Sequence, residues 1–123
     1  MVLTNQKRIQ LLALVCLLVL LASLFIGGHQ PASGKLFTAP WDKLAHFIFY
    51  GALTVVTGIS FPKIKMQLLA LLIILIGATD EIHQIFDPNR DSGFDDLVAD
   101  AIGCLAVLII LKWVRRNFKC FSF

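Results

Sequence analysis

Four long apolar segments, joined by short polar stretches, limit what this chain can fold into more than any other feature of its sequence. Of its 123 residues, 58% are hydrophobic and only 15% are charged, and the mean hydropathy is +0.81. A soluble domain of this length would carry about one quarter charged residues. The sequence therefore predicts an all-helical integral membrane protein, a bundle of four transmembrane helices with a single domain over residues 1–123.

Turn and capping residues set the predicted ends of these helices. Asp42 is suited to an N-cap, because its carboxylate can accept a hydrogen bond from a backbone N–H of the first turn. Pro62 ends the second segment, since proline lacks the N–H that a continuing helix needs. Each segment has about the 20 residues that cross a bilayer. The predicted helices cover residues 9–26, 42–61, 66–86 and 95–113.

The first segment has a second interpretation, a cleavable secretory signal peptide, because small residues follow it at positions 32–34. Its apolar run is long for a signal peptide, and the small residues lie several positions beyond its end. We therefore expect a retained first helix.

Basic residues gather at one side of the four-helix arrangement, and only Lys35, Lys43 and Arg90 fall at the other. Cytoplasmic ends of membrane helices carry the excess of lysine and arginine, so both termini are predicted to be cytoplasmic. The residues on the predicted cytoplasmic side are Lys7, Arg8, Lys63, Lys65, Lys112, Arg115, Arg116 and Lys119.

Acidic residues gather at the opposite side. Seven of the eight lie between Asp80 and Gly103, next to some of the most apolar sequence in the chain. Ionisable groups inside a membrane are costly, face a bundle interior or a wet cavity, and are partnered. This stretch is therefore the candidate site.

Helical spacing indicates which polar residues share a face. On the second predicted helix, Asp42, His46 and Tyr50 recur at every fourth position, with Lys43 beside them. On the fourth, Asp100 follows Asp96 by one turn and lies about 6 Å deeper.

The third predicted helix carries Glu81 and Gln84 on one face, and Asp80 can pair with Gln84 one turn away. Gly103 continues the stripe of the fourth helix and permits close packing of a neighbour. Partners for the buried acids of the fourth helix are expected among Lys43, His46, Gln84 and Arg90.

These elements resemble the VanZ-like family, whose pattern has a DKxxH–Y element, an E–Q pair with a short loop to P-x-R, and a D-x-x-x-N-x-x-G element. One position differs, since the family usually has Asn where this chain has Asp100. The resemblance covers residues 41–103 and is carried by Asp42, Lys43, His46, Tyr50, Gly51, Glu81, Gln84, Pro88, Asn89, Arg90, Asp96, Asp100 and Gly103.

The family is named after a glycopeptide-resistance accessory protein and consists of small multi-span membrane proteins. The resemblance implies a multi-pass protein of the bacterial cytoplasmic (inner) membrane, with a role in the cell envelope or in antibiotic resistance. It implies no particular reaction, cofactor or oligomeric state.

Three functions are compatible with these residues. The first is an outward-facing polar pocket that recognises an envelope lipid, a lipid-linked intermediate or a glycopeptide-type molecule. Lys43 and Arg90 would hold its phosphate or carboxylate, Arg90 as a two-point fork. The residues predicted to line this site are Lys43, His46, Tyr50, Glu81, Gln84, Arg90, Asp96 and Asp100.

The second function is a membrane-embedded enzyme acting on such a molecule. His46 with Glu81, or Asp96 with Asp100, would supply acid–base pairs, and two close carboxylates raise the pKa of one of them. The same four residues offer nitrogen and oxygen ligands for a divalent ion, although the sequence contains no metal motif. No nucleophile motif or phosphate-binding loop identifies a reaction.

The third function is a structural or assembly partner in the membrane, whose polar residues lock the helices together. Nucleic-acid binding is not expected, because the basic residues are spread among segment ends. Cys16, Cys104 and Cys120 form neither a disulfide framework nor a metal motif.

Overall fold

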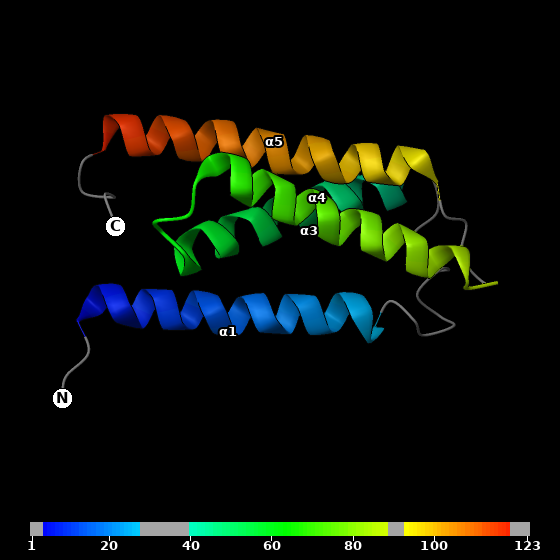
Figure 1. The fold of residues 1–123 in the computed structure, drawn as a ribbon, viewed down its shortest axis with the longest axis horizontal. Helices are drawn as coiled ribbons and strands as arrows, with labels where there is room; N and C mark the ends of the chain where they lie inside the picture. Colours follow the sequence, from blue (N-terminus) through cyan, green and yellow to red (C-terminus); the bar gives the residue numbers. More distant parts are fainter. Residues whose placement is uncertain (1–3, 28–39, 89–92, 119–123) are drawn as a thin grey trace.

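The computed structural model describes residues 4–27, 40–88 and 93–118, and these residues form four helices and no strand (Figure 1). All four are long and apolar enough to cross a membrane. The predicted all-helical class with four membrane-spanning helices is therefore confirmed. The helices are α1 (Asn5–Phe25), α3 (Trp41–Ser60), α4 (Met66–Ile85) and α5 (Phe94–Asn117).

Two helices extend beyond their predicted ends. Helix α1 begins at Asn5, where the hydroxyl of Thr4 accepts a hydrogen bond of 3.4 Å from the backbone N–H of Lys7. Helix α5 continues to Asn117, whose side chain donates to the carbonyl of Trp113 at 2.9 Å. Both predicted ends followed the loss of hydropathy, but lysine, arginine and glutamine continue a helix well once it has formed.

The predicted N-cap at Asp42 is wrong. Helix α3 begins one residue earlier, at Trp41, with Pro40 in the N-cap position and no side-chain cap. Asp42 therefore lies within the first turn, where its carboxylate is 3.7 Å from the ammonium of Lys43. An acidic residue still stabilises this end of the helix through the helix dipole.

The helices alternate in direction, so that the start of α1, the α3–α4 turn and the end of α5 lie at the same end of the bundle (Figure 1). The basic residues of these segments thus share one end, as the sequence predicted. Which side of the membrane this end faces stays a prediction. The described members of the set are Lys7, Arg8, Lys63, Lys65, Lys112, Arg115 and Arg116.

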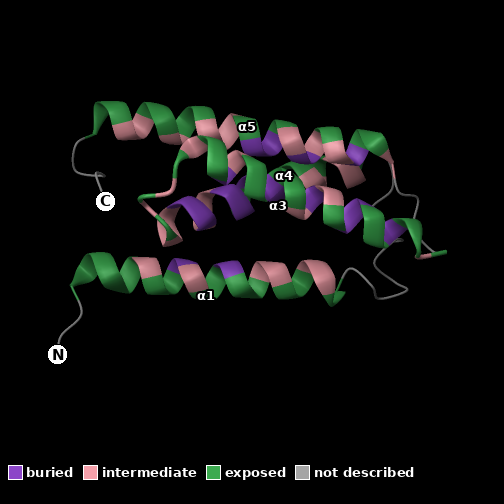
Figure 2. Cartoon of the chain, viewed as in Figure 1, coloured by how far each residue is buried: buried purple, intermediate pink, exposed green. Residues whose placement is uncertain are grey.

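Helix α3 is at the centre of the packing and lies against α1, α4 and α5. Its Tyr50 and Leu53 are at most 1% exposed, and α4 adds Leu69 and Ile73 to the same core. Helix α1 contributes Leu17 and is otherwise mostly exposed (Figure 2). The core therefore depends chiefly on α3, α4 and α5.

Helices α3 and α5 approach each other most closely at Gly103. A Cβ atom added there would collide with the backbone carbonyl oxygen of Phe47 and lie 3.1 Å from its carbonyl carbon. Only glycine allows the two backbones this approach. The predicted packing role of Gly103 is confirmed.

The outward surfaces of the bundle carry large apolar side chains. Leu12 of α1 is 65% exposed and Ile109 of α5 is 70% exposed. Soluble monomers rarely expose so much contiguous apolar surface, whereas hydrocarbon surrounds it without cost. This surface is compatible with a multi-pass membrane protein whose helices are embedded in lipid.

Candidate functional site

Lys43, on the first turn of α3, lies among three carboxylates. Its ammonium is 3.3 Å from Asp96 and 3.4 Å from Asp95, both on α5, and 3.7 Å from Asp42 on its own helix. It donates a hydrogen bond to Oδ1 of Asp96. Lys43 and Asp96 thus form the outer of two polar contacts between α3 and α5.

His46 and Asp100 form the inner contact, one turn further along each helix. Nδ1 of His46 lies 2.8 Å from Oδ1 of Asp100, and the two atoms share a hydrogen bond. A nitrogen and a carboxylate oxygen this close need one proton between them. The pair therefore holds a proton at a defined place inside the bundle.

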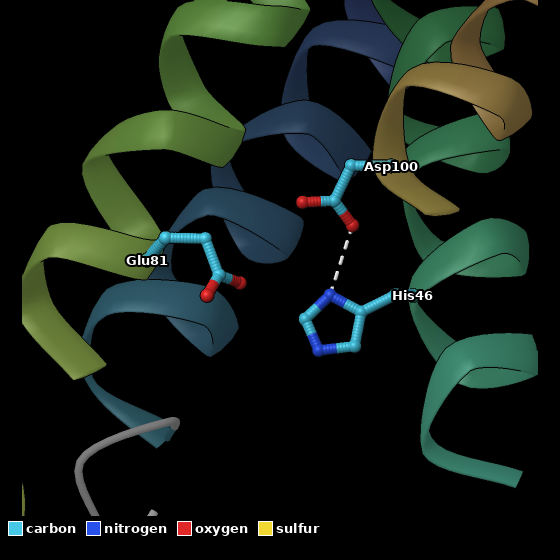
Figure 3. Close-up of side chains that lie close together, drawn as sticks. All are labelled: His46, Glu81 and Asp100. Atoms are coloured by element: carbon cyan, nitrogen blue, oxygen red, sulfur yellow. Dashed lines mark hydrogen bonds and ion pairs between the residues drawn. The ribbon is translucent and has the colours of Figure 1, made fainter. Parts of the chain in front are cut away.

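Glu81 brings a third helix, α4, to this inner contact. Its carboxylate, the imidazole of His46 and the carboxylate of Asp100 reach into one space from three helices (Figure 3). One potential ligand atom from each residue lies within 4.8 Å of the other two. These three residues, together with Lys43 and Asp96, are called the polar cluster below.

Two carboxylate oxygens of the polar cluster are buried without a hydrogen bond among the described residues, namely Oε1 of Glu81 and Oδ2 of Asp100. Glu81 is only 8% exposed and Asp100 only 1%. A buried carboxylate oxygen without a partner costs free energy unless a proton or a cation compensates it. The carboxylates of Glu81 and Asp100 therefore need a further proton or a cation to compensate their charge.

Tyr50 lies one turn beyond His46 on α3. The two rings are stacked, with centroids 6.2 Å apart and planes 4° from parallel, and Phe49 meets Tyr50 edge-on. Tyr50 is 1% exposed. It lies beside the imidazole on the core side of the polar cluster.

Gln84 and Asp80 form the pair that their spacing predicted. The amide of Gln84 donates to Oδ2 of Asp80 at 2.8 Å, and both side chains are buried on α4. The amide of Gln84 is thereby turned toward its own helix. Gln84 belongs to the buried polar face, and its hydrogen bond to Asp80 stays within α4.

Exposure is lowest at Asp100 in the inner contact and highest at Asp95 at the end of the bundle. The side chain of Asp100 is 1% exposed and that of His46 is 12% exposed. Lys43 is 39% exposed and Asp95 is 72% exposed. The polar cluster is therefore reached from the end of the bundle where α3 and α5 begin.

Gly77 was not among the predicted site residues. A Cβ atom at this position of α4 would lie 2.9 Å from Oδ2 of Asp100 and 3.4 Å from Cε1 of Tyr50. Its missing side chain thus makes room for the carboxylate of Asp100. The available signal was its position one turn before Glu81, on the same face of the helix.

Most of the predicted site residues converge in space. Lys43, His46, Glu81, Asp96 and Asp100 form the polar cluster, and Tyr50 supports it. Arg90 lies outside the described residues. The roles assigned to all of these side chains stay predictions.

A family model described as VanZ/LLP1 matches residues 2–115 of the chain. The match extends well beyond residues 41–103, on which the resemblance in the sequence depends. No curated protein matches the chain, and no solved structure matches it.

Proposed function

The chain belongs to the VanZ/LLP1 family, and we propose that its polar cluster recognises the head group of an amphipathic molecule of the cell envelope. The class would include an envelope phospholipid, a lipid-linked intermediate or a glycopeptide-type molecule. The protein would act in the bacterial cytoplasmic membrane, with the polar cluster near its outer face. The apolar surface of the helices would accommodate the lipid tail.

The main observation in support of head-group recognition is that the side chains of the polar cluster differ in exposure. Charged side chains from three helices meet at a buried inner contact, and exposure rises from Asp100 through His46 to Lys43 at the end of the bundle. Charges inside a membrane span are costly and are associated with ligand or ion pathways. A head group could approach along this gradient while its tail remains in the bilayer.

Lys43 limits what kind of head group could bind. It is already paired with three carboxylates, so it would have to leave them in order to hold a phosphate. The polar cluster, taken by itself, has more acidic than basic side chains. Its ligand would therefore offer hydrogen-bond donors or a positive group, or would bind together with a cation.

The test uses the full-length protein in detergent and three probes, phosphatidylglycerol, a polyprenyl phosphate and a glycopeptide antibiotic. A probe at 100 times its Kd should stabilise the fold by about 2.7 kcal/mol, visible as a rise in Tm. Glu81→Gln and Asp96→Asn should reduce that rise. Arg90→Lys should also reduce it for an anionic probe, because an ammonium lacks the planar fork. Equal stabilisation of wild type and all variants would reject recognition by the polar cluster.

Catalysis at the same place is a second candidate, favoured by the contact between His46 and Asp100. A carboxylate that orients an imidazole is a common acid–base arrangement, and Glu81 supplies a further carboxylate beside it. Incubation of the purified protein with the same three probes, followed by mass spectrometry, would detect turnover. Product that forms with wild type and not with Asp100→Asn would support an enzyme.

A packed polar scaffold is the remaining outcome. It predicts that Glu81→Gln and Asp100→Asn alter Tm while probe binding and any cellular phenotype stay at the wild-type level.

A further inference from the structure

We propose that His46, Glu81 and Asp100 form a binding site for one divalent transition-metal cation, of which Zn²⁺ is the best-suited probe. One imidazole and two carboxylates form a set of nitrogen and oxygen ligands that Zn²⁺ accepts. Three protein ligands leave at least one coordination position for water or for a ligand oxygen.

The geometry is close to that of a bound ion. The three candidate ligand atoms lie within 4.8 Å of one another, and each comes from a different helix. Ligands bound about 2.1 Å from a tetrahedral ion lie about 3.4 Å apart. Rotation of the Glu81 side chain, which has three rotatable bonds, could close this difference without moving a helix. The ion would replace the proton between His46 and Asp100.

The unpartnered oxygens are a second and independent observation. Oε1 of Glu81 and Oδ2 of Asp100 make no hydrogen bond within the described residues, and the side chain of Asp100 is only 1% exposed. Lys43 forms ion pairs with Asp42, Asp95 and Asp96, which lie outside this set. A divalent cation would compensate both carboxylates at once.

A bound metal would also indicate which class of head group the polar cluster recognises. This inference rests on the proposed function. An acidic cluster disfavours a phosphate or carboxylate, but a cation with an open position attracts such an oxygen. The open position would face the exposed end of the polar cluster, because the buried sides are occupied by protein. We therefore expect an anionic head group whose oxygen completes the coordination of the ion.

The experiment measures metal binding without any lipid probe, so that it stands apart from the test of the proposed function. Full-length protein in detergent is treated with a chelator and dialysed against Zn²⁺, and bound metal is counted by mass spectrometry. Substitution with Co²⁺ reports the coordination geometry by its visible absorption. One equivalent per chain and a rise in Tm with Zn²⁺ are expected.

Glu81→Gln is the decisive variant, because Oε1 of Glu81 has no hydrogen bond to lose within the described part of the chain, and the fold should persist. It should weaken Zn²⁺ binding at least about tenfold. His46→Gln should do the same, and His83→Gln is its matched control. His83 is an exposed histidine of α4 whose ring packs against Phe25, with centroids 5.7 Å apart.

Loss of Zn²⁺ binding in Glu81→Gln and His46→Gln, with retention in His83→Gln, would establish the site. Binding of well under one equivalent by wild type would overturn it and would leave protons as the compensating charges. Equal affinity in wild type and Glu81→Gln would also overturn it. Either negative result leaves head-group recognition to be decided by the lipid probes alone.

Discussion

Nδ1 of His46 lies 2.8 Å from Oδ1 of Asp100, which joins α3 to α5 across 54 positions of the sequence. The contact is buried on the Asp100 side and 12% exposed on the His46 side. It fixes both the rotation of the imidazole and the register of the two helices. A structural role and a chemical role are therefore combined in the same pair, and variants must be chosen to separate them.

Asp100→Ala should lower the free energy of unfolding by about 1–3 kcal/mol, because it leaves the His46 nitrogen without its partner. Asp100→Asn keeps the shape and can still hydrogen-bond to His46, so it should stay within about 1 kcal/mol of wild type. Denaturation of the full-length protein in detergent measures both. Equal destabilisation by the two variants would contradict a hydrogen-bonding role.

Asp95 and Asp96 are a matched pair, since their carboxylates lie 3.4 and 3.3 Å from the same ammonium of Lys43. Their side chains differ in exposure, 72% for Asp95 and 8% for Asp96. Exposed ion pairs are screened by water and salt and contribute little. Asp96→Asn should therefore lower Tm clearly, and Asp95→Asn should leave it close to wild type. A larger loss in Asp95→Asn would show that the exposed pair dominates.

Gly103→Ala should destabilise the protein by about 1–3 kcal/mol, because the added methyl group collides with the backbone of Phe47 and separates α3 from α5. Gly51→Ala is the control on the facing helix. Its methyl group would lie 3.5 Å from Cγ2 of Val107 and 3.7 Å from the carbonyl oxygen of Gly103, which are ordinary contacts. Denaturation in detergent should place Gly51→Ala near wild type. Equal effects would mean that the crossing tolerates a wider separation.

Helical phase alone was sufficient to predict several of these relationships. Lys43 and His46 on α3, and Asp96 and Asp100 on α5, were each expected on one face of a helix, and the structure brings the two faces together. The cost of leaving charges in contact with lipid gave a physical reason to expect this. Local spacing also predicted the contact between Asp80 and Gln84.

Other features depend on contacts between helices, which the spacing of residues along one helix does not determine. Glu81 and Gln84 were expected to act together, but the contact with His46 and Asp100 comes from Glu81, while Gln84 bonds to Asp80. Positions three apart on a helix differ by about 60° in direction, which is enough to separate their partners. Gly77 was missed because its role is to leave space for the carboxylate of Asp100, which belongs to another helix.

Membrane orientation is testable from the charge distribution. Basic residues favour the cytoplasm, so reporter fusions after Lys65 and after Arg116 should both report a cytoplasmic location. A fusion after Asn89 should report a periplasmic one. The alternating helix directions require the first two fusions to agree with each other. A periplasmic signal after Arg116 would contradict the predicted orientation.

Gly77→Ala separates the site from the fold most directly. The added methyl group would lie 2.9 Å from Oδ2 of Asp100, too close for the carboxylate to keep its position. A shift of a few tenths of an ångström should cost about 1 kcal/mol or more as overpacking, partly offset by the higher helix propensity of alanine. Binding at the polar cluster should suffer more than stability does, because the displaced oxygen belongs to it. Gly51→Ala, on α3, provides the control for adding a methyl group to a buried helical glycine.

The comparison requires two measurements on each variant, Tm in detergent and affinity for Zn²⁺ or for the lipid probe that binds wild type. A near-native Tm with weakened binding in Gly77→Ala, and native values of both in Gly51→Ala, would assign the space beside Asp100 to ligand recognition. Binding that falls only in proportion to stability would instead place Gly77 in the packing of the bundle, where a small residue lets α4 approach its neighbours.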